Sequence, residues 1–226
     1  EPVVAPLPEG TVDGINYLSD TSVVLSVYAP GKEHILAIGD FTGWLPEASH
    51  ILNQTPDGNQ FWIRIDGLDP SRLYRFYYLV DGELIVPDPN TELLIDPRND
   101  RWISEETYPG IGALYEGLPD WQFSVIETGR SPYTWKSNEY SPPEQQDLII
   151  YELLLRDFLE AHDWKTLSDT LDYLENLGIN AIELMPVNEF SGNESWGYNP
   201  LYWMAPDKYY GPREDLKAFI DACHQR

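Results

Sequence analysis

The sequence predicts a multidomain protein in which a β-sandwich precedes an α/β domain with parallel strands. Residues 21–86 contain short alternating runs of apolar and polar residues, broken by turn signals. Residues 103–146 are rich in Pro, Gly, Ser and scattered aromatic residues, and residues 147–226 combine apolar runs with helical periodicity. We therefore expect a sandwich over residues 1–102, a connector over 103–146 and an α/β segment over 147–226.

The expected strands of the first domain are separated by recognisable turns. Pro56-Asp57-Gly58-Asn59 is one turn, and Asp81-Gly82 is a dipeptide that favours a tight hairpin. Strand number and spacing fit an immunoglobulin-like sandwich, a fold of about 100 residues. The strands are expected within "SVVLSVYAP", "HILAIGDF", "QFWIRIDGL", "LYRFYYLV" and "ELIV". The connector that follows is too aromatic for a free linker, so we expect an extended segment packed across both domains.

The second domain reads as strand, helix, strand, helix. "DLIIYELLLRDF" and "INAIELMPV" lack alternation, which is typical of strands buried on both faces of a parallel sheet. The first helix is expected to end at Gly178, and the second to begin near Pro212. Apolar residues mark one face of each helix: Leu167, Leu171, Leu174 and Leu177 in the first, and Leu216, Phe219, Ile220 and Cys223 in the second. Two strands and two helices cannot close a barrel, so the chain is expected to be the N-terminal part of a longer protein.

Composition restricts the partners of the protein. The net charge of −24, from 38 acidic and 14 basic residues, disfavours nucleic acids and anionic membrane surfaces and suits a solvated surface. No apolar run is long enough to span a membrane. No signal peptide precedes Glu1 in this sequence, so either there is none or it has been removed or left out. The single cysteine excludes an internal disulfide bond.

The stretch "SWGYNP", residues 195–200, places Trp196 and Tyr198 in a segment without helical or strand periodicity. Solvated loops prefer small polar residues, so the two rings indicate a surface that holds a flat ligand. The alternative is that the rings are hydrophobic plugs that anchor a long loop.

Several of these motifs together resemble a known enzyme family. "LIIYELLLRDF", "LGINAIELMPVNEF", "SWGYNP" and "DKYYGPREDLKAFIDACHQR" resemble, in order and spacing, the first two β-α units of the α-amylase superfamily, glycoside hydrolase family 13. "VVLSVYAP", "IGDFTGW", "FWIRIDGL" and "YRFYYLVDGELIVPDP" resemble the preceding sandwich, which is related to family 48 carbohydrate-binding modules. The resemblance implies an immunoglobulin-like β-sandwich followed by the start of a truncated (β/α)8 TIM barrel.

The resemblance also implies a function. It points to retaining hydrolysis of α-1,4-glucosidic bonds in starch or glycogen by the full-length protein, with an α-glucan as partner. Similarity to secreted bacterial α-amylases implies a secreted, periplasmic or cell-surface location. Tyr198 would stack under the sugar ring next to the scissile bond, Trp196 would line the same cleft or pack behind the loop, and Asn199 would form a local hydrogen bond where many relatives carry aspartate.

No catalytic residue is expected in this chain. Retaining hydrolysis needs two carboxyl groups about 5 Å apart, and the family's carboxylates follow a "DxxxNH" motif that would lie beyond Arg226. Asp157 and Glu189 follow the two strands, but they match loop-shaping positions, and Arg156 offers either one a salt-bridge partner. Glu152 and Glu183 lie within the strands, where a carboxylate enclosed in a barrel must be paired.

Trp44 matches a glucan-gripping tryptophan of family 48 modules, but Leu84 stands where a second tryptophan usually assists it. We therefore expect Trp44 mainly to fold over the sandwich or against the barrel, with a weak binding role as the alternative. No cofactor is expected, because the four histidines have no metal-ligand spacing. Calcium is a common structural ion in the family, but its ligands are expected mostly outside this chain.

Two other functions remain open from the sequence. The first is a non-catalytic glucan-binding or docking module. The second is a branching or debranching enzyme of the same superfamily, since these enzymes also carry an N-terminal sandwich.

Overall fold

The computed structural model describes all residues 1–226, which fold as two compact units. Unit 1 contains Glu1–Asp96, Pro119–Ser131 and Tyr202–Ala205, and unit 2 contains Pro97–Leu118, Pro132–Leu201 and Pro206–Arg226. The expected boundary after residue 102 therefore differs from the division in the structure. The physical reason is that residues 119–131, expected within the connector, contribute a strand to a sheet of unit 1.

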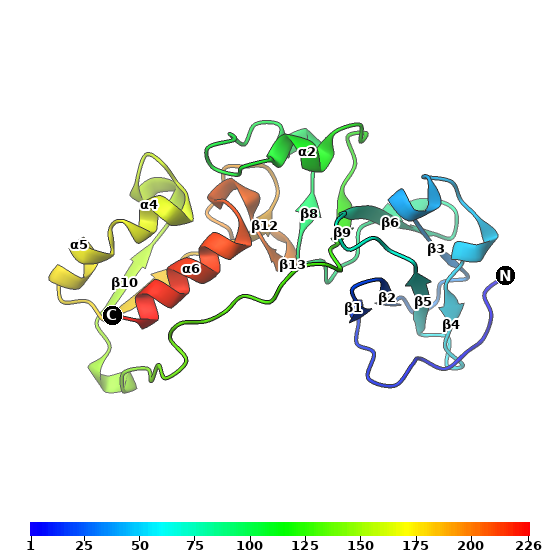
Figure 1. Cartoon of the computed structure of the whole chain (residues 1–226), viewed down its shortest axis with the longest axis horizontal. Coiled ribbons are helices and arrows are strands. Elements are labelled where there is room, and N and C mark those ends of the chain that lie inside the picture. The colour runs from blue at the N-terminus through cyan, green and yellow to red at the C-terminus, as the bar shows by residue number, and fades with distance from the viewer. The chain divides into compact units, whose positions relative to one another are not determined.

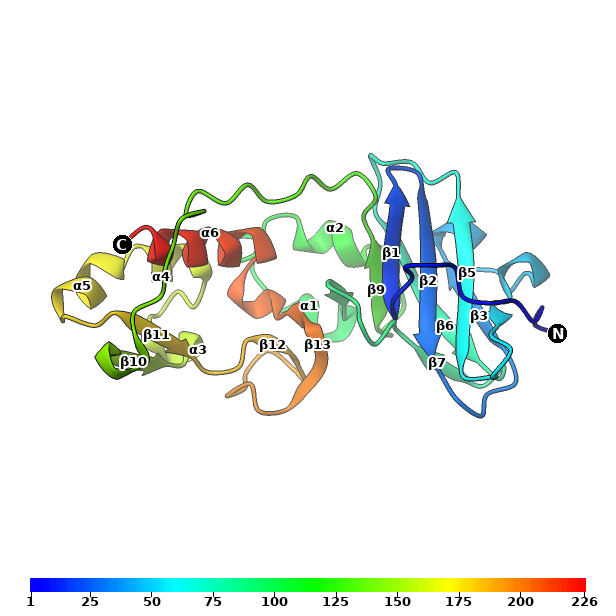
Figure 2. The same ribbon diagram turned by 90° about the horizontal axis from the view of Figure 1, so that it is seen from below.

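Unit 1 contains two antiparallel sheets, with β1, β2 and β5 side by side in Figure 2 and the second sheet behind them. The first sheet has the order β1 (Gly14–Ser19), β2 (Ser22–Tyr28), β5 (Gln60–Asp66), β4 (Asn53–Gln54). The second has the order β3 (Ile35–Gly39), β6 (Tyr74–Val80), β9 (Phe123–Ile126), β8 (Leu94–Ile95), and β7 (Leu84–Val86) pairs with β6. The short 3-10 helices η1 (Asp40–Thr42) and η2 (Ala48–His50) follow β3.

The core of unit 1 lies between these sheets. In β5, Phe61, Ile63 and Ile65 are buried and alternate with more exposed residues, as the period of a half-buried strand requires. β2 is buried along six of its seven residues, because it lies between β1 and β5 and its inner face packs on the second sheet. The strands expected from alternation are confirmed as β2, β3, β5, β6 and β7.

The expected hairpin at Asp81-Gly82 is confirmed. Both residues have positive φ, +52° and +72°, the left-handed conformation that a tight two-residue turn needs. Oδ1 of Asp81 accepts hydrogen bonds from the backbone N–H groups of Glu33 (2.9 Å) and His34 (3.1 Å). These bonds offset the cost of a left-handed non-glycine residue.

A buried carboxyl group joins the strands of the second sheet. The Tyr78 hydroxyl donates to Oδ2 of Asp88 (2.9 Å), and the Asn90 N–H donates to Oδ1 (2.8 Å). The Asp88 N–H in turn donates to Oγ of Ser124 on β9 (2.7 Å). Burial disfavours the charged carboxylate and raises the pKa of Asp88 to about 6, although the Asn90 and Tyr78 hydrogen bonds act in the opposite direction.

Unit 2 is built on a parallel pair of strands, β10 (Ile150–Leu153) and β11 (Ala181–Leu184), in register from Ile150↔Ala181 to Leu153↔Leu184. The helices are α1 (Pro97–Asp100), α2 (Ile111–Tyr115), α3 (Leu155–Phe158), α4 (Trp164–Ser168), α5 (Leu171–Asn176) and α6 (Arg213–His224). The expected strand, helix, strand, helix order is present, with β10, α4, α5 and α6 labelled in Figure 1 and β11 in Figure 2. The remaining elements are β12 (Asn188–Phe190), β13 (Pro200–Pro206), η3 (Gln145–Asp147) and η4 (Lys208–Tyr210).

The first helix of this unit is interrupted. The chain forms α4 and α5 instead of one continuous helix, with a break at Asp169 and Thr170. Leu167, Leu171 and Leu174 are buried as expected, but Leu177 is exposed, so its placement on the buried face was wrong. Leu177 lies after the end of α5, where Gly178 (φ +81°) ends the helical turn.

The strands of the parallel pair are not buried on both faces. Ile150 and Glu152 of β10 are exposed, as is Glu183 of β11, so this prediction was wrong for the chain as described. Helices cover one face of the pair, where Tyr151 and Ile182 pack against the apolar cluster, and no element of this chain covers the other face.

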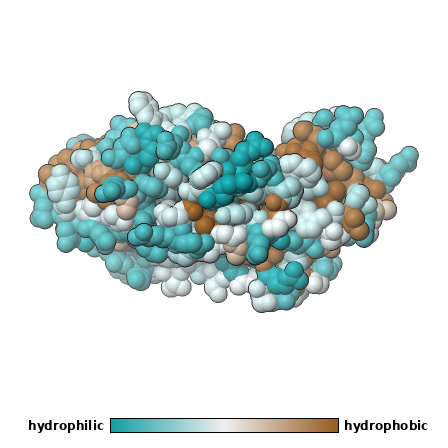
Figure 3. Space-filling view, turned by 90° about the horizontal axis from the view of Figure 1, so that it is seen from above, coloured by the Kyte–Doolittle hydropathy of each residue, from teal (hydrophilic) through white to brown (hydrophobic).

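No helix is long and apolar enough to cross a lipid bilayer. Hydrophilic residues predominate on the face shown in Figure 3, and hydrophobic residues gather in separate areas of it. This agrees with the excess of carboxylates in the sequence.

Candidate functional site

The aromatic stretch lies on the loop between β12 and β13, and both of its rings are exposed. Trp196 and Tyr198 have 62% and 66% of their surface accessible, so neither ring serves as a hydrophobic plug in this chain. The loop follows β11, the second of the two parallel strands. Residues after the carboxyl ends of parallel strands are the usual site-forming positions in α/β folds.

Gly197 sets the turn between the two rings. Its φ is +86°, and a Cβ atom at this position would lie 2.0 Å from the carbonyl oxygen of Pro186. Only glycine allows so close an approach between two backbone segments. The Gly197 N–H donates to Oγ of Ser195 (2.9 Å), and the Ser195 hydroxyl donates to Oδ1 of Asn199. The side chain of Asn199 is thus part of the turn that presents the rings.

Trp44 belongs to unit 1 and is half-buried. Its ring meets Phe123 edge to face at 5.4 Å between centroids and lies 6.0 Å from the ring of Tyr77. Its φ is +65°, and its N–H donates to the carbonyl oxygen of Gly39 (3.1 Å). The side chain therefore packs on the outer face of the second sheet, which agrees with its reading as a packing residue.

The two carboxylates that follow the parallel strands have separate partners. Nε and Nη2 of Arg156 donate to Asp157 at 2.6 and 2.8 Å, and these bonds lower the pKa of Asp157 although desolvation opposes them. Glu189 pairs with Lys208, so Arg156 serves only one of its two expected partners. Glu189 is buried and Asp157 is held by Arg156, so each carboxyl group is occupied by a cation.

Glu152 and Glu183, expected to be paired, are exposed and lie directly opposite each other on β10 and β11. Neither forms an ion pair, so the expectation of pairing was wrong for this chain. The reason is the uncovered face of the parallel pair, where water solvates both carboxylates.

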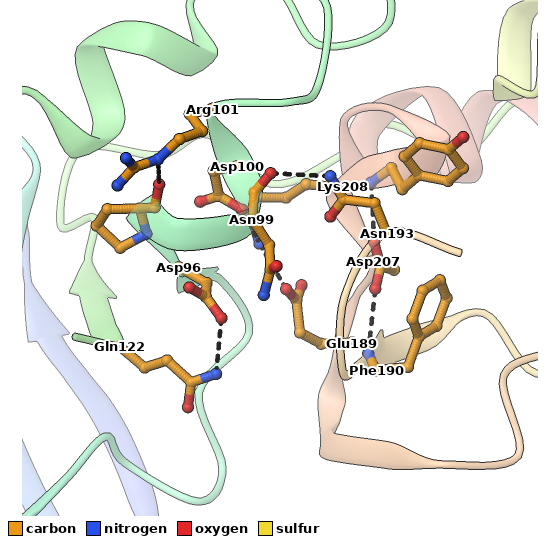
Figure 4. Close-up of polar contacts among 12 residues, drawn as sticks. Asp96, Asn99, Asp100, Arg101, Gln122, Glu189, Phe190, Asn193, Asp207 and Lys208 are labelled. Carbon is orange, nitrogen blue, oxygen red and sulfur yellow. Dashed lines mark hydrogen bonds and ion pairs between the residues drawn. The ribbon is translucent and has the colours of Figure 1, made fainter. Parts of the chain in front are cut away.

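A buried ion cluster lies at the base of the aromatic loop. Nζ of Lys208 lies 2.7 Å from Oε1 of Glu189 and 3.3 Å from Oδ1 of Asp100 (Figure 4). Their side chains are 1%, 7% and 2% exposed. Burial raises the pKa of Glu189 well above its usual range despite the nearby Lys208 cation. Sequence reasoning missed Lys208 and Asp100, because no local pattern joins residues so far apart in the chain.

Asp207 lies next to this cluster and caps the turn that follows β13. Its Oδ1 accepts from the N–H of Tyr209 (2.8 Å) and its Oδ2 from the N–H of Phe190 (3.1 Å). Burial raises the pKa of Asp207 to about 6, while Lys208 acts to lower it.

The side chains of this chain do not form a metal site. No group of three or more His, Cys, Asp or Glu residues is arranged to hold an ion. His162 stacks on Tyr209 with 4.0 Å between ring centroids, and His224 stacks on Tyr140 at 3.9 Å.

Comparison with known proteins identifies the second half of the chain. Residues 128–226 match the model of the α-amylase catalytic domain. The chain is 29% identical over 228 residues to a 1,4-α-glucan branching enzyme of Cupriavidus pinatubonensis, which covers 95% of this chain and 28% of the relative. It is 30% identical over 200 residues to a malto-oligosyltrehalose trehalohydrolase of Mycobacterium tuberculosis, which covers 83% of this chain and 30% of the relative.

The fold also matches a solved structure. A putative α-amylase from Salmonella typhimurium superposes with a TM-score of 0.71 at 24% identity, over 95% of this chain and 31% of that protein. The chain thus spans about 30% of the length of the curated relatives that it matches.

Proposed function

We propose that the protein containing this chain cleaves or transfers glucosidic bonds of α-glucans, since residues 128–226 belong to the family of α-amylase catalytic domains. The relatives named above are glycoside hydrolases and transferases, and their printed names concern α-glucans and malto-oligosaccharides. The finer proposal is retaining hydrolysis of internal α-1,4-glucosidic bonds in starch or glycogen through an aspartyl-glycosyl intermediate.

The observation that carries this proposal is the exposed Tyr198, held on the Gly197 turn after the second parallel strand. A phenol ring offers a flat apolar face, which suits the apolar face of a pyranose. Tyr198 would stack under the sugar next to the scissile bond, Trp196 would line the same cleft, and Asn199 would hold the turn. Trp44 is packed on its own sheet and would contribute little to binding.

The reaction needs two carboxyl groups that this chain does not offer. One attacks the anomeric carbon as nucleophile, while the other protonates the leaving oxygen and later activates water. Asp157 is held by Arg156, and Glu189 is buried against Lys208. We therefore place the catalytic pair outside residues 1–226 and propose that this chain alone is inactive.

The proposal includes the architecture. The two antiparallel sheets of unit 1 would be an immunoglobulin-like module preceding the catalytic domain. The parallel pair and α4 to α6 would be the first two β-α units of a (β/α)8 barrel, whose remaining strands would cover the exposed face of β10 and β11.

A branching reaction is the second candidate, favoured by 29% identity to a branching enzyme over 95% of the chain. In that case a sugar hydroxyl accepts the glycosyl group in place of water. A debranching enzyme and a glucan-binding module without chemistry are further alternatives.

The first test measures two products of the whole protein acting on soluble starch. Hydrolysis raises the number of reducing ends, whereas branching raises the number of α-1,6 branch points at a constant number of reducing ends. Retention on starch beads without either product would support the binding module and would sink the enzymatic proposal.

Tyr198→Ala tests the stacking role. We expect kcat on starch to fall about fivefold, because an aromatic contact contributes about 1 kcal/mol beyond its buried area. The sugar ring flattens in the transition state, so the contact with the Tyr198 ring strengthens there. Tyr173→Ala is the matched control, because Tyr173 is also an exposed tyrosine of unit 2, on α5. Equal kcat values for the two variants would contradict the stacking role.

A further inference from the structure

The buried ion cluster of Lys208, Glu189 and Asp100 joins three separate segments of unit 2. Asp100 ends α1, Glu189 lies in β12 and Lys208 begins η4 (Figure 4). All three side chains are almost completely inaccessible to solvent. Ions in such an environment must be paired at close range, so the three segments are held in one relative arrangement.

Two of these segments are the ends of the aromatic loop. β12 leads into residues 191–199, and Asp207 and Lys208 directly follow β13, which leads out. Two hydrogen bonds close the same base: the Asp207 N–H donates to the carbonyl oxygen of Val187 (2.8 Å), and the Phe190 N–H donates to the side-chain Oδ2 of Asp207 (3.1 Å). The entry and exit of the loop are therefore fastened together.

The loop itself is tied to α1. Nδ2 of Asn193 donates to the carbonyl oxygen of Asn99 (2.8 Å), the residue before Asp100. α1 is thus linked to the ion cluster through Asp100 and to the loop through the carbonyl group of Asn99. Asn193 lies only a few residues before Trp196 and Tyr198 in the same loop. The rings of Trp196 and Tyr198 are exposed, so they do not anchor the loop themselves.

A gain in folding stability alone does not explain why this cluster is built from charged residues. A buried ion pair is often no more stabilising than apolar residues of similar volume, whereas its short range restricts the geometry of its partners. Here Nζ of Lys208 lies 2.7 Å from Oε1 of Glu189 and 3.3 Å from Oδ1 of Asp100. The short distances and the burial of all three side chains therefore fit a positioning role.

We propose that the Lys208–Glu189–Asp100 cluster, together with the Asn193 bond to α1, is a positioning device that holds the loop of Tyr198. None of the four residues touches the substrate. They act by keeping the loop in the conformation in which the ring of Tyr198 faces the ligand. The link to Tyr198 rests on the proposed function, whereas the restraint of the loop does not.

The test uses the whole protein with Lys208→Met, Glu189→Gln and Asp100→Asn combined. This neutral variant nearly keeps the side-chain volumes and avoids the unpaired carboxylates that loss of Lys208 alone would create at Glu189 and Asp100. Asp207 keeps its hydrogen bonds from the backbone N–H groups of Phe190 and Tyr209. We expect amide hydrogen exchange in residues 191–199 to accelerate by about tenfold or more, with exchange in β10, β11 and α6 unchanged. We also expect kcat on starch to fall about as much as in Tyr198→Ala, with a smaller change in KM.

Arg226→Met is the matched control, because Arg226 forms ion pairs with Asp172 and Glu175 at the surface of the same unit. It is expected to leave exchange in the loop unchanged. Should the neutral variant fail to fold, Asn193→Ala replaces it, since this change removes only the bond to α1 and is expected to raise exchange in the loop by a smaller factor.

The two readouts separate the possible failures. Unchanged exchange in residues 191–199, or an increase spread evenly over unit 2, would overturn the positioning role. Faster exchange confined to the loop in a protein that neither cleaves nor transfers α-glucans would support the restraint and overturn the proposed function. Faster exchange with wild-type kcat would overturn the link between the cluster and Tyr198.

Discussion

Replacing Gly197 with alanine is expected to destabilise unit 2 by about 2–5 kcal/mol, the sum of a left-handed backbone cost and an overpacking cost. The added Cβ would lie 2.0 Å from the carbonyl oxygen of Pro186, and neither backbone segment has a flexible end that could move aside. Denaturant unfolding of the whole protein, followed by the signal of unit 2, measures the loss. Because the turn presents Tyr198, activity on starch should fall as well.

Gly192→Ala is the control for this prediction. Gly192 lies on the same loop with φ +82°, and nothing lies within 4 Å of its hypothetical Cβ. Its substitution therefore carries the backbone cost alone, about 1–2 kcal/mol. If both variants unfold at the same denaturant concentration, the close approach of Gly197 to Pro186 does not constrain the loop.

Asp88→Asn is expected to change the pH dependence of unfolding of unit 1. The folded-state pKa of Asp88, about 6, lies above the ordinary value of 3.8, so the folded chain binds more protons than the unfolded chain between these values. The stability that protonated Asp88 contributes is fully present below about pH 4 and is lost as the pH rises through 6. The loss amounts to about 3 kcal/mol.

The asparagine side chain stays neutral throughout this range. The free energy of unfolding of Asp88→Asn, relative to wild type, should therefore rise by up to about 3 kcal/mol between pH 4 and pH 7. If the introduced amide at position 88 fails to make the hydrogen bond with Tyr78 or Asn90, the free energy of unfolding falls by the same amount at every pH, so its slope with pH is unchanged. Asp66→Asn, at an exposed position on β5, controls for the removal of one surface charge. Parallel pH curves for wild type and Asp88→Asn would contradict the prediction.

The elements that the sequence predicts well are those set by local patterns. β5 alternates in burial as its residues alternate in polarity, and α6 begins after Pro212 as expected. The Asp81-Gly82 hairpin adopts the positive φ values that its residue types favour. In each case a few neighbouring residues carry all the information.

The elements that the sequence misses depend on distant partners. β9 has only four residues and reads as connector, and it is a strand because β6 and β8 supply its hydrogen bonds. The leucine periodicity of residues 167–177 predicts one continuous helix, but the structure has a break between α4 and α5, and Leu177 is exposed. The exposure of β10 likewise depends on which elements cover it.

The sequence by itself determined the aromatic loop, the glycine between its two rings and the resemblance to the α-amylase superfamily, because each lies within a short stretch of residues. Only the tertiary structure decided which charges are buried together. Lys208 meets Glu189 and Asp100 because η4, β12 and α1 converge. The energy of a buried charge depends on the atoms that surround it, and residues far apart in the chain supply those atoms.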